Sequence, residues 1–74
     1  MHSTPEDFDF SVVRDLRKRA GLTLAEVSER SGISIAGLSR IERNQTVLEL
    51  GTLYRLSRAL GLSGTDLLGL AESC

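Results

Sequence analysis

The sequence predicts an all-α domain of five short helices, and three observations support this fold class. Apolar residues recur with the i, i+3, i+4 spacing of a helix in five successive stretches. Glycines, or a serine or threonine in a capping position, separate most of these stretches. No segment alternates apolar and polar residues over the length of a strand, apart from short ambiguous ones such as residues 46–50. A chain of 74 residues forms one domain.

The first helix is expected over residues 10–20, with Gly21 as its end. Its apolar stripe comprises Val13, Leu16 and Ala20. The segment before it, residues 1–9, carries acids but no base and has no helical pattern. We therefore expect a disordered tail there, followed by a folded domain over residues 10–74.

Capping signals open the second and third helices. Thr23 and Glu26 have the spacing of a capping box, in which each side chain accepts a hydrogen bond from the other residue's backbone. Gly32 ends this second helix, and Ser34 is the expected N-cap of the third. The buried faces comprise Leu24, Val27, Ser28 and Ser31 in the second helix, and Leu38 and Ile41 in the third.

A polar run at residues 43–46 interrupts the pattern before a fourth helix, which is expected to end at Gly61. Ser63 caps a short fifth helix, and Asp66 lies in its first turn, where a carboxylate interacts favourably with the helix dipole. The buried faces comprise Leu53, Leu56, Ser57 and Leu60 in the fourth helix, and Leu67, Leu68 and Ala71 in the fifth.

The composition argues against an enzyme and against a metal or membrane protein. His2 is the only histidine and Cys74 the only cysteine, so the chain has no metal-ligand spacing, no nucleophile paired with a base and no internal disulfide. It also lacks a phosphate-binding glycine loop, and we expect no cofactor. No apolar run is long enough to span a bilayer. The lone cysteine fits the reducing cytoplasm.

The charge is unevenly distributed along the chain. The formal net charge is −1, but all nine Lys and Arg residues lie between residues 10 and 58, where they face five acids. That central region therefore carries a net charge of +4 and is flanked by acidic ends. A basic centre is compatible with contact to phosphates.

The most informative stretch lies between residues 24 and 43. Two helices that meet at a steep angle need a small residue where their backbones approach, a glycine in the turn and apolar residues in the corner. Ser28 is the small residue and Gly32 is the turn glycine. The corner residues are Val27, Ile33, Leu38 and Ile41. This spacing predicts a helix-turn-helix.

The chain resembles the phage-repressor and Cro type of helix-turn-helix domain, the XRE family, over residues 13–68. The runs that carry this resemblance are Val13-Arg14-x-Leu16-Arg17, Gly21-Leu22-Thr23-Leu24-Ala25-Glu26-Val27, Arg30-Ser31-Gly32-Ile33-Ser34, Leu38-Ser39-Arg40-Ile41-Glu42-Arg43, Leu53, Leu56, Ala59-Leu60-Gly61-Leu62-Ser63 and Leu67-Leu68. The resemblance implies a lambda-repressor-like five-helix bundle that places its third helix in the major groove of DNA, usually as a dimer on paired half-sites. Three residues depart from the family pattern: Ser28 replaces the commoner alanine, Leu24 a DNA-contacting glutamine, and Leu48-Glu49 the usual Pro-Ser.

Helical geometry separates the outward face of the third helix from its buried face. Leu38 and Ile41 define the buried direction, so Arg40 points outward, as the only long side chain there with several donors. The predicted base-reading residues are Ser34, Ile35, Ala36, Ser39 and Arg40. The alternative is a solvated face on which Arg40 pairs with an acid such as Glu29.

Contacts to the DNA backbone are expected from the rim of this surface. Thr23 lies at the start of the second helix, where free N–H groups bind a phosphate readily. The loop after the third helix supplies the other candidates, which are Arg43, Asn44, Gln45 and Thr46. For the loop the alternative is turn chemistry, which Asn44 alone could explain.

Arg17 and Glu42 have a different predicted role. Each lies close to the apolar stripe of its helix, and a charge buried there without a partner is costly. We expect them to form a structural ion pair that orients the third helix. The family resemblance implies the same, because family members have a similar arrangement at the matching positions.

The sequence therefore predicts a non-catalytic, sequence-specific DNA-binding transcriptional regulator, acting at the nucleoid in a prokaryotic cytoplasm. Its partners would be double-stranded operator DNA and a second copy of the chain. The residues expected to supply the two-fold contact are Val47, Leu48, Leu50, Leu62 and Leu68. The alternative is a helical protein-interaction module, or an antitoxin-like partner, on the same fold.

Overall fold

A computed structural model describes residues 8–72 and contains five helices, as predicted. The helices are α1 (Val12–Arg19), α2 (Leu24–Ser31), α3 (Ile35–Glu42), α4 (Leu50–Ala59) and α5 (Gly64–Ala71). The described residues contain no strand, and their one β-type pairing is an isolated bridge between Phe8 and Glu72. Within this part of the chain no helix has the length and apolar character needed to cross a membrane.

Helices α2, α3 and α5 begin where the capping signals place them. At α2 the Thr23 hydroxyl accepts a hydrogen bond from the Glu26 amide at 3.1 Å, and the Glu26 carboxylate accepts one from the Thr23 amide at 2.8 Å. The Ser34 hydroxyl accepts from the Gly37 amide at the start of α3. The Ser63 hydroxyl does the same for α5. These contacts satisfy amides that lack partners within the first turn of a helix.

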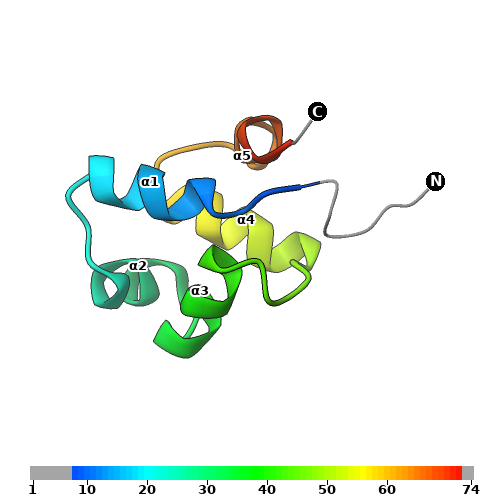
Figure 1. Ribbon diagram of the computed structural model, residues 1–74. Coiled ribbons are helices and arrows are strands. Elements are labelled where there is room, and N and C mark those ends of the chain that lie inside the picture. Colours follow the sequence, from blue (N-terminus) through cyan, green and yellow to red (C-terminus); the bar gives the residue numbers. More distant parts are fainter. Residues whose placement is uncertain (1–7, 73–74) are drawn as a thin grey trace.

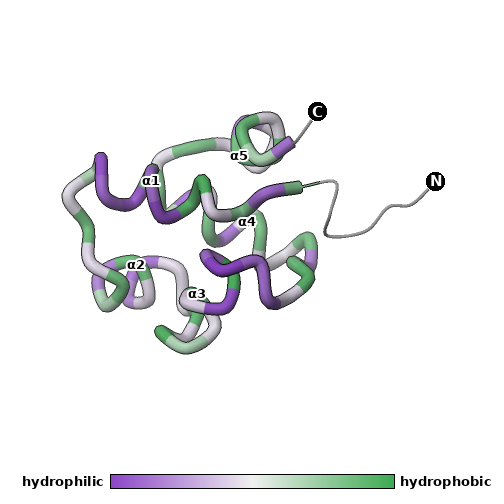
Figure 2. Tube along the Cα trace, in the orientation of Figure 1, coloured by the Kyte–Doolittle hydropathy of each residue, from purple (hydrophilic) through white to green (hydrophobic). Residues whose placement is uncertain are grey.

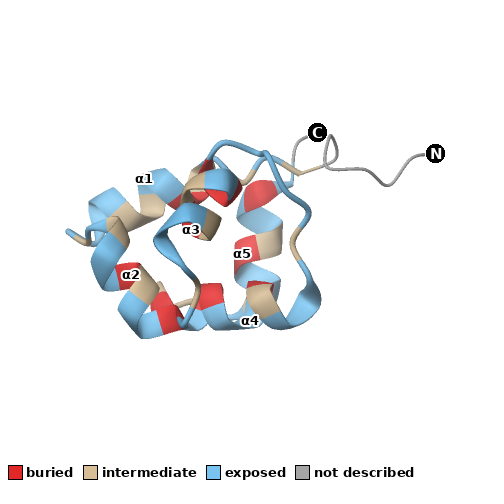
Figure 3. Cartoon of the chain, turned by 90° about the horizontal axis from the view of Figure 1, so that it is seen from below, coloured by how far each residue is buried: buried red, intermediate tan, exposed pale blue. Residues whose placement is uncertain are grey.

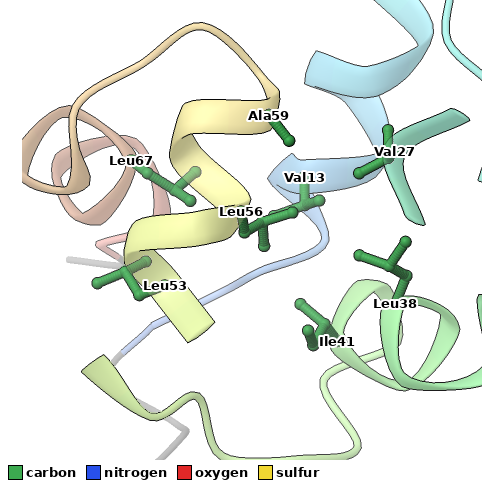
Figure 4. Packing of buried hydrophobic residues seen from close by; sticks show 8 residues of the cluster. All are labelled: Val13, Val27, Leu38, Ile41, Leu53, Leu56, Ala59 and Leu67. Carbon is green, nitrogen blue, oxygen red and sulfur yellow. The ribbon is translucent and has the colours of Figure 1, made fainter. Parts of the chain in front are cut away.

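The hydrophobic core lies around α4, which packs against both α2 and α5 (Figure 4). Its members, from all five helices, are Val13, Val27, Leu38, Ile41, Leu53, Leu56, Ala59 and Leu67. Helices α2 and α3 lie together on one side of this core, and α5 lies on the opposite side (Figure 1). The core therefore fixes α3 relative to α2 and leaves its outer surface exposed (Figure 3).

The N-terminal boundary differs from the expectation. Helix α1 begins at Val12 rather than at residue 10, because Phe10 and Ser11 belong to the turn that precedes it. Phe8 and Asp9 belong to the folded part of the molecule, since Asp9 donates its amide hydrogen to the carbonyl of Ala71. The rest of the expected disordered tail, residues 1–7, lies outside the described residues.

Candidate nucleic-acid interface

Helices α2 and α3 are joined by a turn of three residues that positions α3. Gly32 has φ 77°, a left-handed conformation that suits glycine, and its amide bonds to the carbonyl of Ser28. The hydroxyl of Ser31 accepts a hydrogen bond from the amide of Ile33 at 3.1 Å, which holds the turn from inside. The chain therefore leaves α2 and enters α3 with all three turn residues constrained.

Arg17 and Glu42 form a bidentate ion pair that ties α1 to the C-terminal end of α3. The Arg17 Nε and Nη2 atoms donate to the two carboxylate oxygens of Glu42 at 2.8 and 3.2 Å. Nη1 donates to the carbonyl of Leu22 at 3.0 Å, so the same guanidinium also holds the loop before α2. Both side chains are nearly buried, at 11% and 7% exposure. The hydrogen bonds to Glu42 raise the pKa of the Arg17 guanidinium above its ordinary value.

The outward face of α3 is open to a partner. Ser34, Ile35, Ala36 and Arg40 are exposed, and Ser39 is partly buried. Ile35 keeps 49% of its surface exposed at the outer end of the helix, where Figure 2 shows an apolar tip. Among residues 8–72 Arg40 takes part in no ion pair, so the alternative pairing with Glu29 is not formed. Within the described part of the chain, the face thus presents methyl groups, hydroxyls and one guanidinium that forms no ion pair.

A groove runs between α3 and the loop that precedes α4. It has a volume of about 290 Å³ and is lined by Ile33, Gly37, Arg40, Ile41, Thr46, Val47, Leu48, Glu49 and Thr52.

Gly37 in α3 has little free space around it. A Cβ atom on Gly37 would lie 3.1 Å from the Ser34 hydroxyl and 3.3 Å from a methyl of Ile33. Glycine therefore keeps the N-cap and the turn in place, and packing accounts for it without a DNA contact.

The rim residues predicted to meet DNA backbone have different surroundings. Thr23 is exposed at the N-terminus of α2. Arg43, Gln45 and Thr46 are exposed around the C-terminal end of α3, where the Arg43 Nε atom donates to the carbonyl of Ser39 at 3.2 Å. All five predicted residues, Asn44 included, are thus exposed to solvent.

Asn44 is exposed like the other four residues, but both polar atoms of its side chain have hydrogen-bond partners inside the chain. Its Oδ1 accepts from the Phe10 amide and its Nδ2 donates to the Asp9 carboxylate, each at 2.8 Å. The residue also has φ 57°. The turn chemistry considered above explains this backbone conformation. Its partners lie 34 and 35 residues earlier in the sequence, and no local pattern predicts them.

A second groove, which the sequence did not indicate, lies between α4 and α5. It has a volume of about 560 Å³, carries no charged residue in its lining, and is formed by Leu50, Gly51, Leu53, Tyr54, Gly64, Thr65 and Leu68. Of the residues expected to supply a two-fold contact, Val47 and Leu50 are exposed, at 72% and 79%. The others pack against the core, and these are Leu48, Leu62 and Leu68. Tyr54, which is 57% exposed, was not predicted to lie on this surface, since its position in the sequence alone did not separate it from core residues.

Comparison with protein families matches residues 13–67 to the family described as HTH_3, helix-turn-helix. The chain belongs to this helix-turn-helix family. The chain is also 46% identical over 52 residues to an uncharacterized HTH-type transcriptional regulator of Sinorhizobium fredii, over 70% of this chain and 68% of that protein. The members of this family are DNA-binding transcriptional regulators. Membership therefore confirms the prediction of a DNA-binding transcriptional regulator that is not an enzyme.

Solved structures of similar fold support the same assignment. The helix-turn-helix chain is similar to the restriction-modification controller protein C.AhdI from Aeromonas hydrophila, with a TM-score of 0.77 at 25% identity, over 86% of this chain and 98% of that one. It is similar to the clp gene regulator ClgR from C. glutamicum, with a TM-score of 0.76 at 30% identity, over 90% of this chain and 87% of that one. The predicted five-helix, lambda-repressor-like fold is thus confirmed.

Proposed function

We propose that this helix-turn-helix regulator binds double-stranded DNA in a sequence-specific manner, with α3 in the major groove. The observation that carries the proposal is the outward face of α3, which is exposed and begins at a capped N-terminus, and whose Arg40 has no ion-pair partner among residues 8–72. A major groove admits a helix of this size and displays base edges to its side chains. Binding to operators would place the regulator on the nucleoid.

Within this arrangement the side chains of α3 have separate tasks. Arg40 would donate two hydrogen bonds to the O6 and N7 atoms of one guanine. Ile35 and Ala36 offer methyl surface to the methyl groups of thymines, and Ser34 and Ser39 supply hydroxyls that bond to bases or to adjacent phosphates. With one charged base-contacting residue and several small ones, each domain would recognise a short DNA sequence.

The rim of the same surface would hold the phosphates. Thr23 lies at the N-terminus of α2, where the amides of the first turn that the capping box does not occupy would attract an anion. Arg43, Gln45 and Thr46 lie around the C-terminal end of α3 and would reach phosphates on the other side of the DNA major groove. These contacts fix the register of the domain and carry no sequence information.

We further propose that the DNA-bound form is a homodimer assembled through the groove between α4 and α5. The lining is apolar and uncharged, so a second copy can approach without repulsion between like charges. Leu50 and Tyr54 flank this groove and are among the most exposed large apolar residues of the described chain. Helix α5 lies on the opposite side of the core from α3, so the DNA-reading helices stay uncovered (Figure 1). A two-fold dimer would match a two-fold operator.

Selection of bound sequences from a random duplex library, followed by titration at several salt concentrations, tests the proposal. We expect one enriched sequence and an affinity that falls with salt, with a log–log slope of about −0.9 for each phosphate contacted. The exposed apolar tip of α3 and the net charge of −1 are also compatible with a protein-binding module. A library that yields no enriched sequence, together with an affinity that does not change with salt, would favour that second function.

A further inference from the structure

Asn44 occupies a position that is glycine in two other helices of this molecule. Helices α1, α3 and α4 end alike, with a residue of positive φ after the C-cap and two backbone hydrogen bonds that return to the last turn. At α1 and α4 this residue is Gly21, with φ 73°, and Gly61, with φ 79°. Among residues 8–72 Asn44 is the only non-glycine residue with positive φ. Glycine adopts this conformation without steric cost, and asparagine, which also tolerates it, adds a side-chain amide that glycine lacks.

What the side chain supplies is a bridge across the fold. The Oδ1 atom of Asn44 accepts from the amide of Phe10, and Nδ2 donates to the carboxylate of Asp9, both at 2.8 Å. These partners belong to the segment before α1, residues 8–11, which we call the arm. One amide group therefore fastens the C-terminal end of α3 to the arm by two hydrogen bonds in opposite directions.

The arm is itself anchored at other points. The amide of Asp9 donates to the carbonyl of Ala71 at 2.6 Å, and Phe8 forms an antiparallel bridge with Glu72. The Asp9 carboxylate also accepts from the amide and hydroxyl of Ser11, at 3.0 and 2.6 Å. Together with the Asn44 bond, these contacts lower the pKa of Asp9 and keep its carboxylate charged. Figure 1 shows the arm passing beside the C-terminal end of α5 on its way to α1. Asn44 is thus bonded to a fixed part of the molecule.

We propose that Asn44 is a positioning residue of the DNA interface, which holds the loop over residues 43–46 against the arm. The side chains on either side, Arg43 and Gln45, are exposed and would reach the phosphates. Their direction depends on the backbone at Asn44, which the bridge holds in one conformation. Asn44 itself contacts the arm and not DNA. This inference rests on the proposed function and adds a residue that acts through others.

The first test removes the bridge with Asn44→Gly, which keeps the positive φ accessible and deletes the amide. We expect affinity for the selected operator and for random duplex to fall together, by about fivefold, which is the scale of one net hydrogen bond. The salt slope should become shallower, because Arg43 loses its phosphate contact. Amide hydrogen exchange at Phe10 should become about tenfold faster. The variant Gly61→Asn measures, in the free protein, what asparagine costs at the same helix-end position without a bridge.

The second test separates positioning from direct contact with DNA. Asp9→Ala and Asp9→Asn remove the same negative charge, but only Asn keeps an oxygen that can accept from Asn44 and Ser11. We expect Asp9→Ala to bind DNA about threefold more weakly than Asp9→Asn, although the two variants carry equal charge. If Asn44 touched a phosphate directly, Asp9→Ala would free its amide and bind at least as tightly as Asp9→Asn.

Each result has a separate meaning. Wild-type protein that binds operator while Asn44→Gly binds equally well overturns the positioning role and leaves the proposed function standing. A loss confined to the operator, with random duplex unaffected, also overturns it, since Asn44 would then be reading a base. Wild-type protein that binds no duplex removes the proposed function, and the positioning role falls with it.

Discussion

Arg40 and Arg43 lie three residues apart at the C-terminal end of α3, and their surroundings predict opposite behaviour in DNA binding. Arg40 lines the groove beside the reading face, whereas Arg43 folds back so that its Nε atom bonds to the carbonyl of Ser39. We expect Arg40→Ala to cost about 1–3 kcal/mol on the selected operator and far less on random duplex. One base position should become permissive while the others keep their preference.

Arg43→Ala is the matched control for this measurement. It should weaken binding to every sequence by a similar factor and make the salt slope shallower by about one unit. The free energy of unfolding of both variants should lie within about 0.5 kcal/mol of the parent's, because neither side chain supports the core. An unchanged ratio of operator to random affinity in Arg40→Ala would show that α3 does not read bases through this residue.

The ion pair of Arg17 and Glu42 contributes to the stability of the fold and is not a contact to DNA. Arg17→Ala would leave the Glu42 carboxylate nearly buried without its partner, which typically costs about 3–5 kcal/mol. A small domain has a total stability of about 5 kcal/mol, so only about 0–2 kcal/mol would remain and the variant should unfold at a much lower temperature than the parent. Chemical denaturation followed by circular dichroism measures the loss.

A double variant shows whether the unpaired charge causes this loss. Arg17→Met with Glu42→Met replaces both charges by apolar side chains of similar length, and such replacements are often close to neutral. We expect the double variant to be more stable than Arg17→Ala. Equal stability of the two would mean that the bond from Arg17 to the Leu22 carbonyl, and not the ion pair, holds the end of α1 in place.

At the scale of the helix, the capping box of α2 gives the domain a dependence on acid. The hydrogen bond from the Thr23 amide is the main cause of a lowered pKa at Glu26. A carboxyl group whose pKa is lower in the folded state contributes stability above its ordinary pKa and loses it as the pH falls through the lowered value. Unfolding experiments across the acid range should therefore show stability falling as Glu26 gains a proton.

The variant Glu26→Gln identifies the contribution of this residue. Glutamine keeps an oxygen that accepts from the Thr23 amide, but it does not titrate. The variant should lose stability less steeply than the parent as the solution becomes more acid, with Asp9 responsible for part of the remaining dependence. An identical slope in parent and variant would assign the acid dependence to other groups.

Local signals in the sequence predicted the elements well, because the physics that sets them is local. Thr23, Ser34 and Ser63 cap the helices to which they were assigned, since a cap depends on residues within one turn. The pairing of Arg17 with Glu42 could be inferred because two charges on apolar stripes need each other. The bridge from Asn44 to the arm could not be inferred, since nothing near Asp9 or Asn44 in the sequence indicates a partner more than thirty residues away.

The same limit applies to the predicted surface for assembly. The sequence offered five apolar residues for this surface, but it could not tell that three of them, Leu48, Leu62 and Leu68, would pack against the core. Leu62 and Leu68 pack against the core, while Leu50 stays exposed and Tyr54 joins it on the same face. The difference depends on how α4 and α5 approach each other, which is a property of the whole molecule.

The proposed dimer makes the last prediction at the scale of the whole molecule. Leu50→Glu would place a carboxylate on the groove between α4 and α5, and the two-fold axis would bring the partner copy's carboxylate close to it. Like charges in an apolar interface strongly oppose association. We expect sedimentation at high concentration to show a dimer for the parent and a monomer for Leu50→Glu. Helix content should be unchanged, because the Leu50 side chain is 79% exposed in the single chain.

The loss of the dimer should also change how Leu50→Glu binds DNA. A monomer keeps the whole reading face of α3, so Leu50→Glu should bind an isolated half-site as well as the parent does. On an operator with two half-sites it should lose the gain that comes from linking two binding events. Leu70→Glu is the matched control, since Leu70 is also an exposed leucine but does not line the groove. If Leu50→Glu remains a dimer while Leu70→Glu becomes a monomer, the chains associate through the outer surface of α5 and not through this groove.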